Sequence, residues 1–549
     1  MSRFLRTAAV LLALEAGLTV AAPTARATGP TVKLDNGTFV GTTSGSVSKF
    51  LGIPFAQSPT GDLRFRLPKT IDPYTGTQTV SAFGPACPQQ EITLPINNAL
   101  AQDAIDFIVN ELYSVVSPSS EDCLTLNVVK PASATASSKL PVVVWIFGGG
   151  FEIGGTSIYD GGSIVQKSID LGEPVVYVSM NYRVSAFGFL ASEEVKNAGI
   201  GNLGLQDQRE ALRWIQKYIG AFGGDPTKVT IWGESAGAIS VALHMITNGG
   251  DTEGLFRGAF MQSGSPIPVG DISNGQKYYD ALVDETGCSG TADTLQCLRA
   301  APYGTLKSAV DKSPMIFAYQ SLNLAWLPRV DGTFLTDTPF NLVQQGSVAN
   351  IPFITGDCDD EGTLFSLSNT NVTTDADVKD YISSIYLSTA SSADVDHLLD
   401  LYTDDITKGS PYSTGILNAI TPQFKRLAAL QGDVVFQAPR RFFLKNRADK
   451  QNAWSFLSKR LKLLPVLGSV HASDLLNVYG SGDMVDYLVR FAATLDPNGN
   501  TGINWPQYTT ASPQLLTFQD GLIPLTITQD TYRQAGMEFL MQLSLVNPL

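Results

Sequence analysis

The sequence predicts an α/β fold with a large, mostly parallel central sheet. Short apolar runs rich in β-branched residues recur along the chain, and each ends at a Gly-, Ser- or Asp-rich turn. Helical patterns lie between these runs, and strands without alternation are typical of a sheet that helices cover on both faces. Hydrophobic residues make up 44% of the 549 residues and charged residues only 16%, which fits a large globular body rather than disorder.

The N-terminus predicts a secretory signal peptide over residues 1–27. Two arginines precede the apolar stretch Ala-Ala-Val-Leu-Leu-Ala-Leu, and Ala25-Arg26-Ala27 is a small-x-small cleavage site. We therefore expect a secreted protein whose mature chain, 28–549, forms one domain. No later stretch has the roughly 20 apolar residues of a spanning helix, so no transmembrane anchor is expected.

Export makes the five cysteines interpretable as disulfide partners. Cys87 and Cys123 bracket one loop, Cys288 and Cys297 bracket a shorter one, and Cys358 is left as a free thiol. Asn36-Gly-Thr and Asn371-Val-Thr are N-glycosylation acceptors, in keeping with export.

The expected central strands follow in chain order. They are Val142–Phe147, Val175–Met180, Val229–Trp232, Gly258–Gln262, Ile351–Thr355 and Trp454–Leu457. A helix is expected over Leu205–Ile219, where Leu205, Leu212, Ile215 and Ile219 fall on one face. Chemistry in such folds sits on loops beyond the carboxyl ends of the strands.

Gly233-x-Ser235-x-Gly237 joins the strand at Val229–Trp232 to the helix-compatible stretch Ala-Ile-Ser-Val-Ala-Leu-His-Met. A serine at the apex of a strand–turn–helix is a nucleophile elbow, and small neighbours let strand and helix approach closely. The alternative is an ordinary Gly/Ser turn, which the strand and helix context disfavours.

A serine hydroxyl needs a base, and the chain has three histidines. His244 lies in the elbow helix and His397 in an amphipathic surface pattern, so both are expected to be structural. His471 follows the last strong strand and leaves room for an acid between nucleophile and base, the chain order of this type of triad.

The acid is expected in the turn Gly356-Asp-Cys-Asp-Asp-Glu-Gly. Its four carboxylates are Asp357, Asp359, Asp360 and Glu361, and the pattern alone does not choose among them. Upstream, Gly148-Gly149-Gly150 follows a strand, so the N–H groups of Gly149 and Gly150 together with that of Ala236 predict an oxyanion hole. A plain glycine loop is the alternative.

These residues give the chain a resemblance to the type-B carboxylesterase/lipase family of α/β-hydrolases, and within it to the fungal Candida rugosa-type lipases and sterol esterases. The motifs that carry it include Phe50-Leu-Gly-Ile-Pro-Phe-Ala, Ser119-Ser-Glu-Asp-Cys-Leu, Gly148-Gly-Gly-Phe, Gly201-Asn-Leu-Gly-Leu, Gly233-Glu-Ser-Ala-Gly and Asp359-Asp-Glu-Gly-Thr. The resemblance implies that Glu361 is the acid and His471 the base. It also implies an acyl pocket that includes Phe151, Leu364 and Phe365, where related lipases often carry paired phenylalanines in place of the last two.

The resemblance further implies that loop 88–122 is a mobile lid over a hydrophobic tunnel. The loop carries Ile92, Leu94, Ile96, Leu100, Ile105, Phe107, Ile108, Val109, Leu112 and Val115. The alternative is a small amphipathic helix packed permanently on the core. A homodimer through the open lid surface is a further expectation.

The expected function is a secreted serine hydrolase of lipid esters, triacylglycerols or sterol esters, that works through an acyl-enzyme and without a cofactor or metal. Its expected partners are lipid esters and the lipid–water interface; a net charge of −14 argues against nucleic acid. The alternatives are a carboxylesterase of short soluble esters, or a catalytically dead binding relative, which would usually have lost a triad member.

Overall fold

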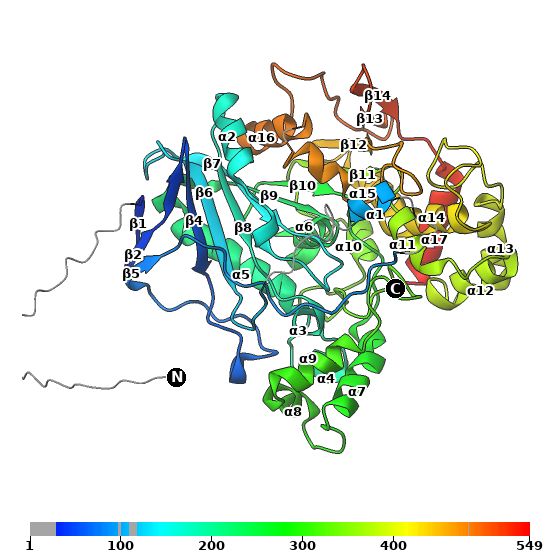
Figure 1. The fold of residues 1–549 in the computed structure, drawn as a ribbon, viewed down its shortest axis with the longest axis horizontal. Helices are drawn as coiled ribbons and strands as arrows, with labels where there is room; N and C mark the ends of the chain where they lie inside the picture. Colours follow the sequence, from blue (N-terminus) through cyan, green and yellow to red (C-terminus); the bar gives the residue numbers. More distant parts are fainter. Residues whose placement is uncertain (1–28, 97–99, 101, 109–117, 481) are drawn as a thin grey trace, which may run out of the picture.

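The computed structural model describes residues 29–96, 100, 102–108, 118–480 and 482–549. The signal-peptide prediction and Val109, Leu112 and Val115 lie outside these residues. The described part of the chain holds an 11-stranded sheet of order β14-β13-β12-β11-β10-β9-β7-β8-β6-β4-β3 and a 3-stranded sheet of order β1-β2-β5 (Figure 1). The α/β-hydrolase expectation for the fold is therefore confirmed.

The seven strands from β13 to β8 in this order run parallel, and antiparallel strands extend the sheet at both ends. The strands are β1 Thr31–Leu34, β2 Asn36–Val40, β3 Thr42–Ser44, β4 Val47–Pro54, β5 Thr75–Thr79, β6 Thr125–Pro131, β7 Leu140–Ile146, β8 Val176–Met180, β9 Gly224–Glu234, β10 Gly258–Gln262, β11 Phe353–Cys358, β12 Ala453–Lys459, β13 Gln514–Gln519 and β14 Leu525–Gln529.

All six expected core strands are present, within a few residues of their predicted bounds, except that β9 begins earlier, at Gly224. Their side chains are buried on both faces, as continuous apolar runs require. The expected helix at Leu205–Ile219 is α5, Leu203–Tyr218.

Helices cover both faces of the sheet: α2 and α16 pack on one side, and α5 and α6 on the other (Figure 1). The helices are α1 Gln102–Phe107, α2 Gly162–Asp170, α3 Ser185–Phe189, α4 Glu193–Asn197, α5 Leu203–Tyr218, α6 Ala236–Ile246, α7 Gln276–Glu285, α8 Thr294–Ala300, α9 Tyr303–Asp311, α10 Pro339–Gln345, α11 Thr363–Ser366, α12 Asp375–Ile385, α13 Ser392–Leu401, α14 Phe424–Gly432, α15 Ala438–Arg447, α16 Met484–Thr494 and α17 Gln534–Val546.

A π-helical segment, Asp433–Gln437, joins α14 to α15 without a break. Its residues are all buried. Single π turns inside α-helices are often found at functional sites, and this one lies behind the turn that follows β11.

The structure contains both expected disulfides, Cys87–Cys123 and Cys288–Cys297, and Cys358 is a buried free cysteine. Asn36 and Asn371 are exposed, so both glycosylation acceptors stay available as predictions. Among the described residues no helix is long and apolar enough to cross a membrane.

Candidate active site

Ser235 lies between β9 and α6 in a conformation that side chains rarely adopt, with φ of 55° and ψ of −125°. Small residues on either side permit it. A Cβ built on Gly233 would lie 2.4 Å from the Gly237 carbonyl carbon, and one on Gly237 would lie 2.0 Å from the Ile146 carbonyl oxygen. The elbow therefore needs both glycines, because any larger residue would push β9, β7 and α6 apart.

The structure brings the expected serine, histidine and glutamate into one hydrogen-bonded line. His471 Nε2 lies 2.8 Å from Ser235 Oγ, and His471 Nδ1 lies 2.5 Å from Glu361 Oε2. The other oxygen, Oε1, accepts the Cys358 backbone N–H at 2.6 Å. Ser235 follows β9, Glu361 follows β11 and His471 follows β12, so three strand ends at one edge of the sheet supply the line.

The other three carboxylates of the acidic turn do not reach His471. Asp357 pairs with Arg440, while Asp359 and Asp360 both bind Lys462 Nζ at 2.6 Å. Geometry thus separates Glu361 from its neighbours, a distinction that spacing alone left open.

The remaining histidines are placed as expected. His244 is buried in α6 and its Nε2 lies 2.8 Å from Gln208 Oε1. His397 is exposed on α13, with its ring edge-on to Phe539. Among the described residues no group of three or more His, Cys, Asp or Glu side chains could hold a metal ion.

Burial disfavours the charged forms of the triad. It lowers the pKa of His471, although Asp474 and Asp357 favour the protonated ring. It raises the pKa of Glu361, against hydrogen bonds from Ser263 and the Cys358 N–H. At neutral pH His471 is therefore a neutral imidazole, which is the form that can accept a proton from Ser235.

The glycine loop after β7 lies against the elbow. A Cβ on Gly148 would come 2.7 Å from Glu234 oxygens and 2.9 Å from the Ser235 Cβ. Gly149 and Gly150 have φ of 110° and 63°, which glycine adopts without strain. Ala236 is the first residue of α6, where the backbone N–H groups lack partners within the helix and can point at an anion.

Apolar side chains pack around the histidine ring. Phe365 and Phe436 lie with ring centroids 5.2 Å and 4.6 Å from that of His471. Phe151 and Leu364 are buried. Three of these four were expected from the sequence; Phe436, from the π segment, was not.

Two buried carboxylates near His471 were also missed. Glu234 Oε1 lies 3.3 Å from His471 Nε2, and among the described residues it has no hydrogen-bond partner. Asp474 accepts a 2.9 Å hydrogen bond from Gln262. Burial raises the pKa of Glu234 well above its ordinary value, and Asp474 and Glu361 add to the effect. Glu234 directly precedes Ser235, and Asp474 follows His471 by three residues, so closeness in sequence was the available signal.

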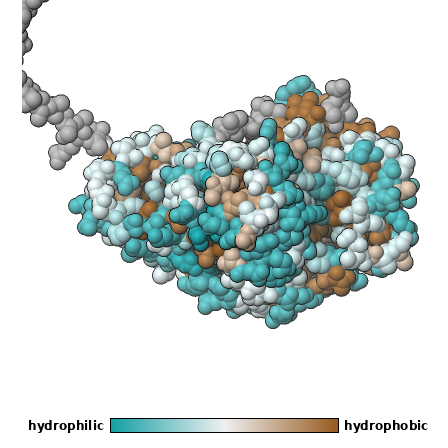
Figure 2. Space-filling view, turned by 90° about the horizontal axis from the view of Figure 1, so that it is seen from below, coloured by the Kyte–Doolittle hydropathy of each residue, from teal (hydrophilic) through white to brown (hydrophobic). Residues whose placement is uncertain are grey.

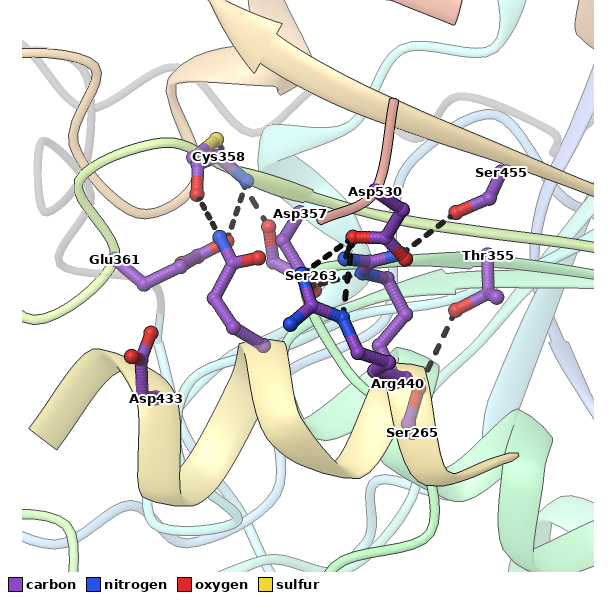
Figure 3. Close-up of polar contacts among 12 residues, drawn as sticks. Ser263, Ser265, Thr355, Asp357, Cys358, Glu361, Asp433, Arg440, Ser455 and Asp530 are labelled. Atoms are coloured by element: carbon purple, nitrogen blue, oxygen red, sulfur yellow. Dashed lines mark hydrogen bonds and ion pairs between the residues drawn. The ribbon is translucent and has the colours of Figure 1, made fainter. Parts of the chain in front are cut away.

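A second polar network lies behind β11 (Figure 3). Arg440 donates to Asp357 at 2.8 Å and to both oxygens of Asp530 at 2.9 Å. Gln437 Nε2 donates to the Cys358 carbonyl at 2.7 Å. Since the Cys358 N–H binds Glu361, the π segment is linked through one residue to the acid turn.

The family model described as "Carboxylesterase family" matches residues 28–539. The chain belongs to the carboxylesterase family. Within this family it is a serine carboxylic-ester hydrolase, as the sequence predicts.

Two relatives and one solved structure illustrate the likeness to other carboxylesterases. Lipase 2 of Diutina rugosa is 46% identical over 88% of this chain and 91% of its own length. A secreted triacylglycerol lipase of Gibberella zeae is 41% identical over 94% and 90%. The crystal structure of Aspergillus niger EstA matches with a TM-score of 0.80 and 29% identity, covering 95% of this chain and 99% of that one.

Proposed function

We propose that the protein is a secreted hydrolase of lipid esters, triacylglycerols or sterol esters, with a signal peptide at 1–27 and one catalytic domain at 28–549. The observation that carries the proposal is the line from Ser235 through His471 to Glu361. The relatives named as lipases support lipid esters as the substrate class.

In this mechanism Ser235 Oγ attacks the ester carbonyl while His471 Nε2 takes the hydroxyl proton. The N–H groups of Gly149, Gly150 and Ala236 stabilise the negative charge on the carbonyl oxygen. His471 then protonates the leaving alcohol, and an acyl-enzyme remains on Ser235. Water, deprotonated by His471, releases the fatty acid. Glu361 holds the ring and stabilises its protonated form.

Phe151, Leu364 and Phe365 form the proposed acyl-binding wall. All three are buried, and Phe365 lies next to the reacting histidine. Apolar walls suit an alkyl chain, because moving it out of water gains about 25 cal/mol per Å².

Variants of the triad test the chemistry. Ser235→Ala and His471→Ala should fold normally and lose several orders of magnitude in kcat. Glu361→Gln should cost up to about 10⁴-fold, as the loss of a comparable triad carboxylate does. Activity on p-nitrophenyl butyrate and unfolding temperature are the measurements. Full activity in Ser235→Ala would refute the mechanism.

We also propose interfacial activation by opening of loop 88–122. Of its described residues, Leu100, Phe107 and Ile108 are buried. A lipid surface would offer these side chains an apolar environment and select an open form.

The alternative is a carboxylesterase of short soluble esters, in which α1 stays packed and the same side chains are permanently buried. Activity is to be measured below and above the solubility limit of the ester. A rise above the limit supports opening. Phe107→Ser and Ile108→Ser should reduce hydrolysis of emulsified ester more than that of p-nitrophenyl butyrate, and equal losses would favour the alternative.

A further inference from the structure

Three neighbouring loops carry large apolar side chains that are exposed to water. They are loop 415–418, loop 461–466 and the β13–β14 turn 520–524. Their exposed residues are Ile416, Leu417, Leu463, Leu522 and Ile523, with exposed fractions from 64% to 103%. We call this set the apolar rim.

Hydrogen bonds hold the three loops beside one another. The Lys462 N–H donates to Asp520 Oδ2 at 3.3 Å, and the Val466 N–H donates to Asn418 Oδ1 at 3.0 Å. Loop 461–466 therefore lies between the other two, with Leu463 near its middle. Exposed leucines scattered singly need no explanation, but a cluster from three loops marks an interaction surface.

The apolar rim lies at the same edge of the sheet as the active site. In the sheet register, Cys358 of β11 lies opposite Ser458 of β12, and Lys459 of β12 lies opposite Gln519 of β13. The three strands therefore end level with each other. Parallel strands lie about 4.8 Å apart, so the loops after them are close neighbours of the Glu361 turn. Loop 461–466 also precedes His471 by only a few residues.

Three basic side chains next to the apolar rim are paired with carboxylates of the protein. Lys462 Nζ binds Asp359 and Asp360, Lys459 lies 4.0 Å from Asp359, and Arg460 pairs with Asp483. No surplus positive charge is left by these pairs for anionic headgroups or nucleic acid. An uncharged, apolar occupant fits this surface best.

We propose that the apolar rim is a fixed contact surface for a neutral lipid phase, separate from loop 88–122. This proposal rests on the function proposed above, since it assumes that the substrate forms such a phase. The rim would hold the catalytic edge of the sheet against the lipid while ester molecules enter the site. Figure 2 shows one face of the molecule, which is mainly hydrophilic and has apolar side chains gathered in separate patches. The position of such patches decides how the protein is oriented on a lipid surface.

The test compares two double variants of exposed residues. Leu463→Ser with Leu522→Ser changes the rim, and Leu67→Ser with Val546→Ser changes exposed apolar residues outside it. Each pair is made in the Ser235→Ala background, and adsorption to triolein droplets and to phosphatidylcholine vesicles is measured by flotation. The rim variant should bind at least about tenfold more weakly, and the control within about twofold of the parent.

Salt and oligomeric state discriminate among occupants. Binding should change little between low and high NaCl, because contact through apolar side chains is not screened by salt. Equal adsorption of rim and control variants, or adsorption lost at high salt, would overturn the proposal. So would a dimeric parent whose rim variant is monomeric in sedimentation velocity, since a second copy would then occupy the rim.

With Ser235 intact, both double variants should hydrolyse p-nitrophenyl butyrate as fast as the parent. An inactive parent would refute the proposed function and leave the adsorption result unaffected.

Discussion

At the scale of single residues, neighbouring carboxylates in one turn have different tasks. Glu361 reaches His471. Asp360, one residue earlier, accepts hydrogen bonds from Ser410 Oγ, Tyr412 N and Ser469 N, and so ties loop 410–412 to the loop that carries His471. Asp359 binds only lysines among the ion pairs described.

This division predicts different losses for the three amide variants. Glu361→Gln should lower kcat strongly with little change in unfolding temperature. Asp360→Asn should mainly destabilise, by about 1–3 kcal/mol, because a buried network loses a charge-assisted acceptor. Asp359→Asn should be mildest in both measurements. An aspartate variant as inactive as Glu361→Gln, while still fully folded, would show that the acid is wrongly assigned.

The buried imidazole predicts an acid limb in the pH profile. Burial lowers the pKa of His471 in the folded protein, so the ring stays neutral below its ordinary pKa of about 6.5. Activity is present above the folded pKa and is lost as the pH falls through it. The value of kcat/KM for a soluble ester should therefore fall with an apparent pKa below 6.5. A midpoint above 6.5 would contradict this assignment.

At the scale of elements, the π segment joins the helices to the active site. Phe436 packs on the His471 ring, and Gln437 binds the Cys358 carbonyl. Tyr532 donates its hydroxyl proton to Gln437 Oε1 at 2.5 Å, which fixes the amide between two partners. One turn of helix thus contacts both the His471 ring and the strand end that precedes Glu361.

We expect Gln437→Leu to lower kcat/KM about tenfold as the acid turn loosens, in addition to destabilising the protein by about 1–3 kcal/mol. Gln431→Leu is the matched control: this buried amide on α14 binds Asn369, Tyr381 and Ser366 and does not contact Cys358. It should destabilise similarly and retain activity. Equal kcat/KM losses would mean that Gln437 acts only through stability.

Sequence patterns predicted the central parallel strands because continuous apolar runs identify strands buried on both faces. They missed β1 to β6, β13 and β14, which are antiparallel or at the margins. Strands such as β5 and β14 are largely exposed, so apolar periodicity carries little information there. Ser235 and His471 could be predicted from the elbow motif and from the order of nucleophile, acid and base along the chain. Glu361 was singled out from four carboxylates only by the family resemblance, because spacing does not separate them. Phe436, Gln437 and the Asp360 contacts were not, because tertiary packing alone brings them to His471 and Glu361.

At the scale of the whole molecule, a buried ion network binds the C-terminal segment to the sheet. Arg440 from α15 lies between Asp357 of β11 and Asp530, which follows β14, and Arg441 also binds Asp530 (Figure 3). All four groups are buried or nearly so. Burial opposes ionisation of Asp530, but the two guanidinium groups hold its pKa well below the ordinary value.

The network predicts loss of stability in acid. Because the folded pKa of Asp530 is depressed, its contribution is present above the unfolded pKa of about 3.9 and is lost as the pH falls below that value. Asp530→Asn should lower the free energy of unfolding at neutral pH by about 3–5 kcal/mol, since two arginines lose a buried partner. Its unfolding temperature should also vary less between pH 5 and pH 3 than that of the parent. The same acid sensitivity in variant and parent would exclude Asp530 as a source.

The bond between Cys87 and Cys123 has a consequence for how relatives can diverge. With their Cα atoms 5.0 Å apart, the two ends of the intervening segment are fixed to the body of the enzyme independently of what lies between them. Between these ends, Gln90 donates to the Ser313 carbonyl and Glu121 pairs with Arg64, so an exchanged segment needs to keep both contacts. Swapping the segment between relatives, cysteine to cysteine, should transfer substrate preferences that depend on its residues while leaving the strand ends that hold Ser235, Glu361 and His471 in place.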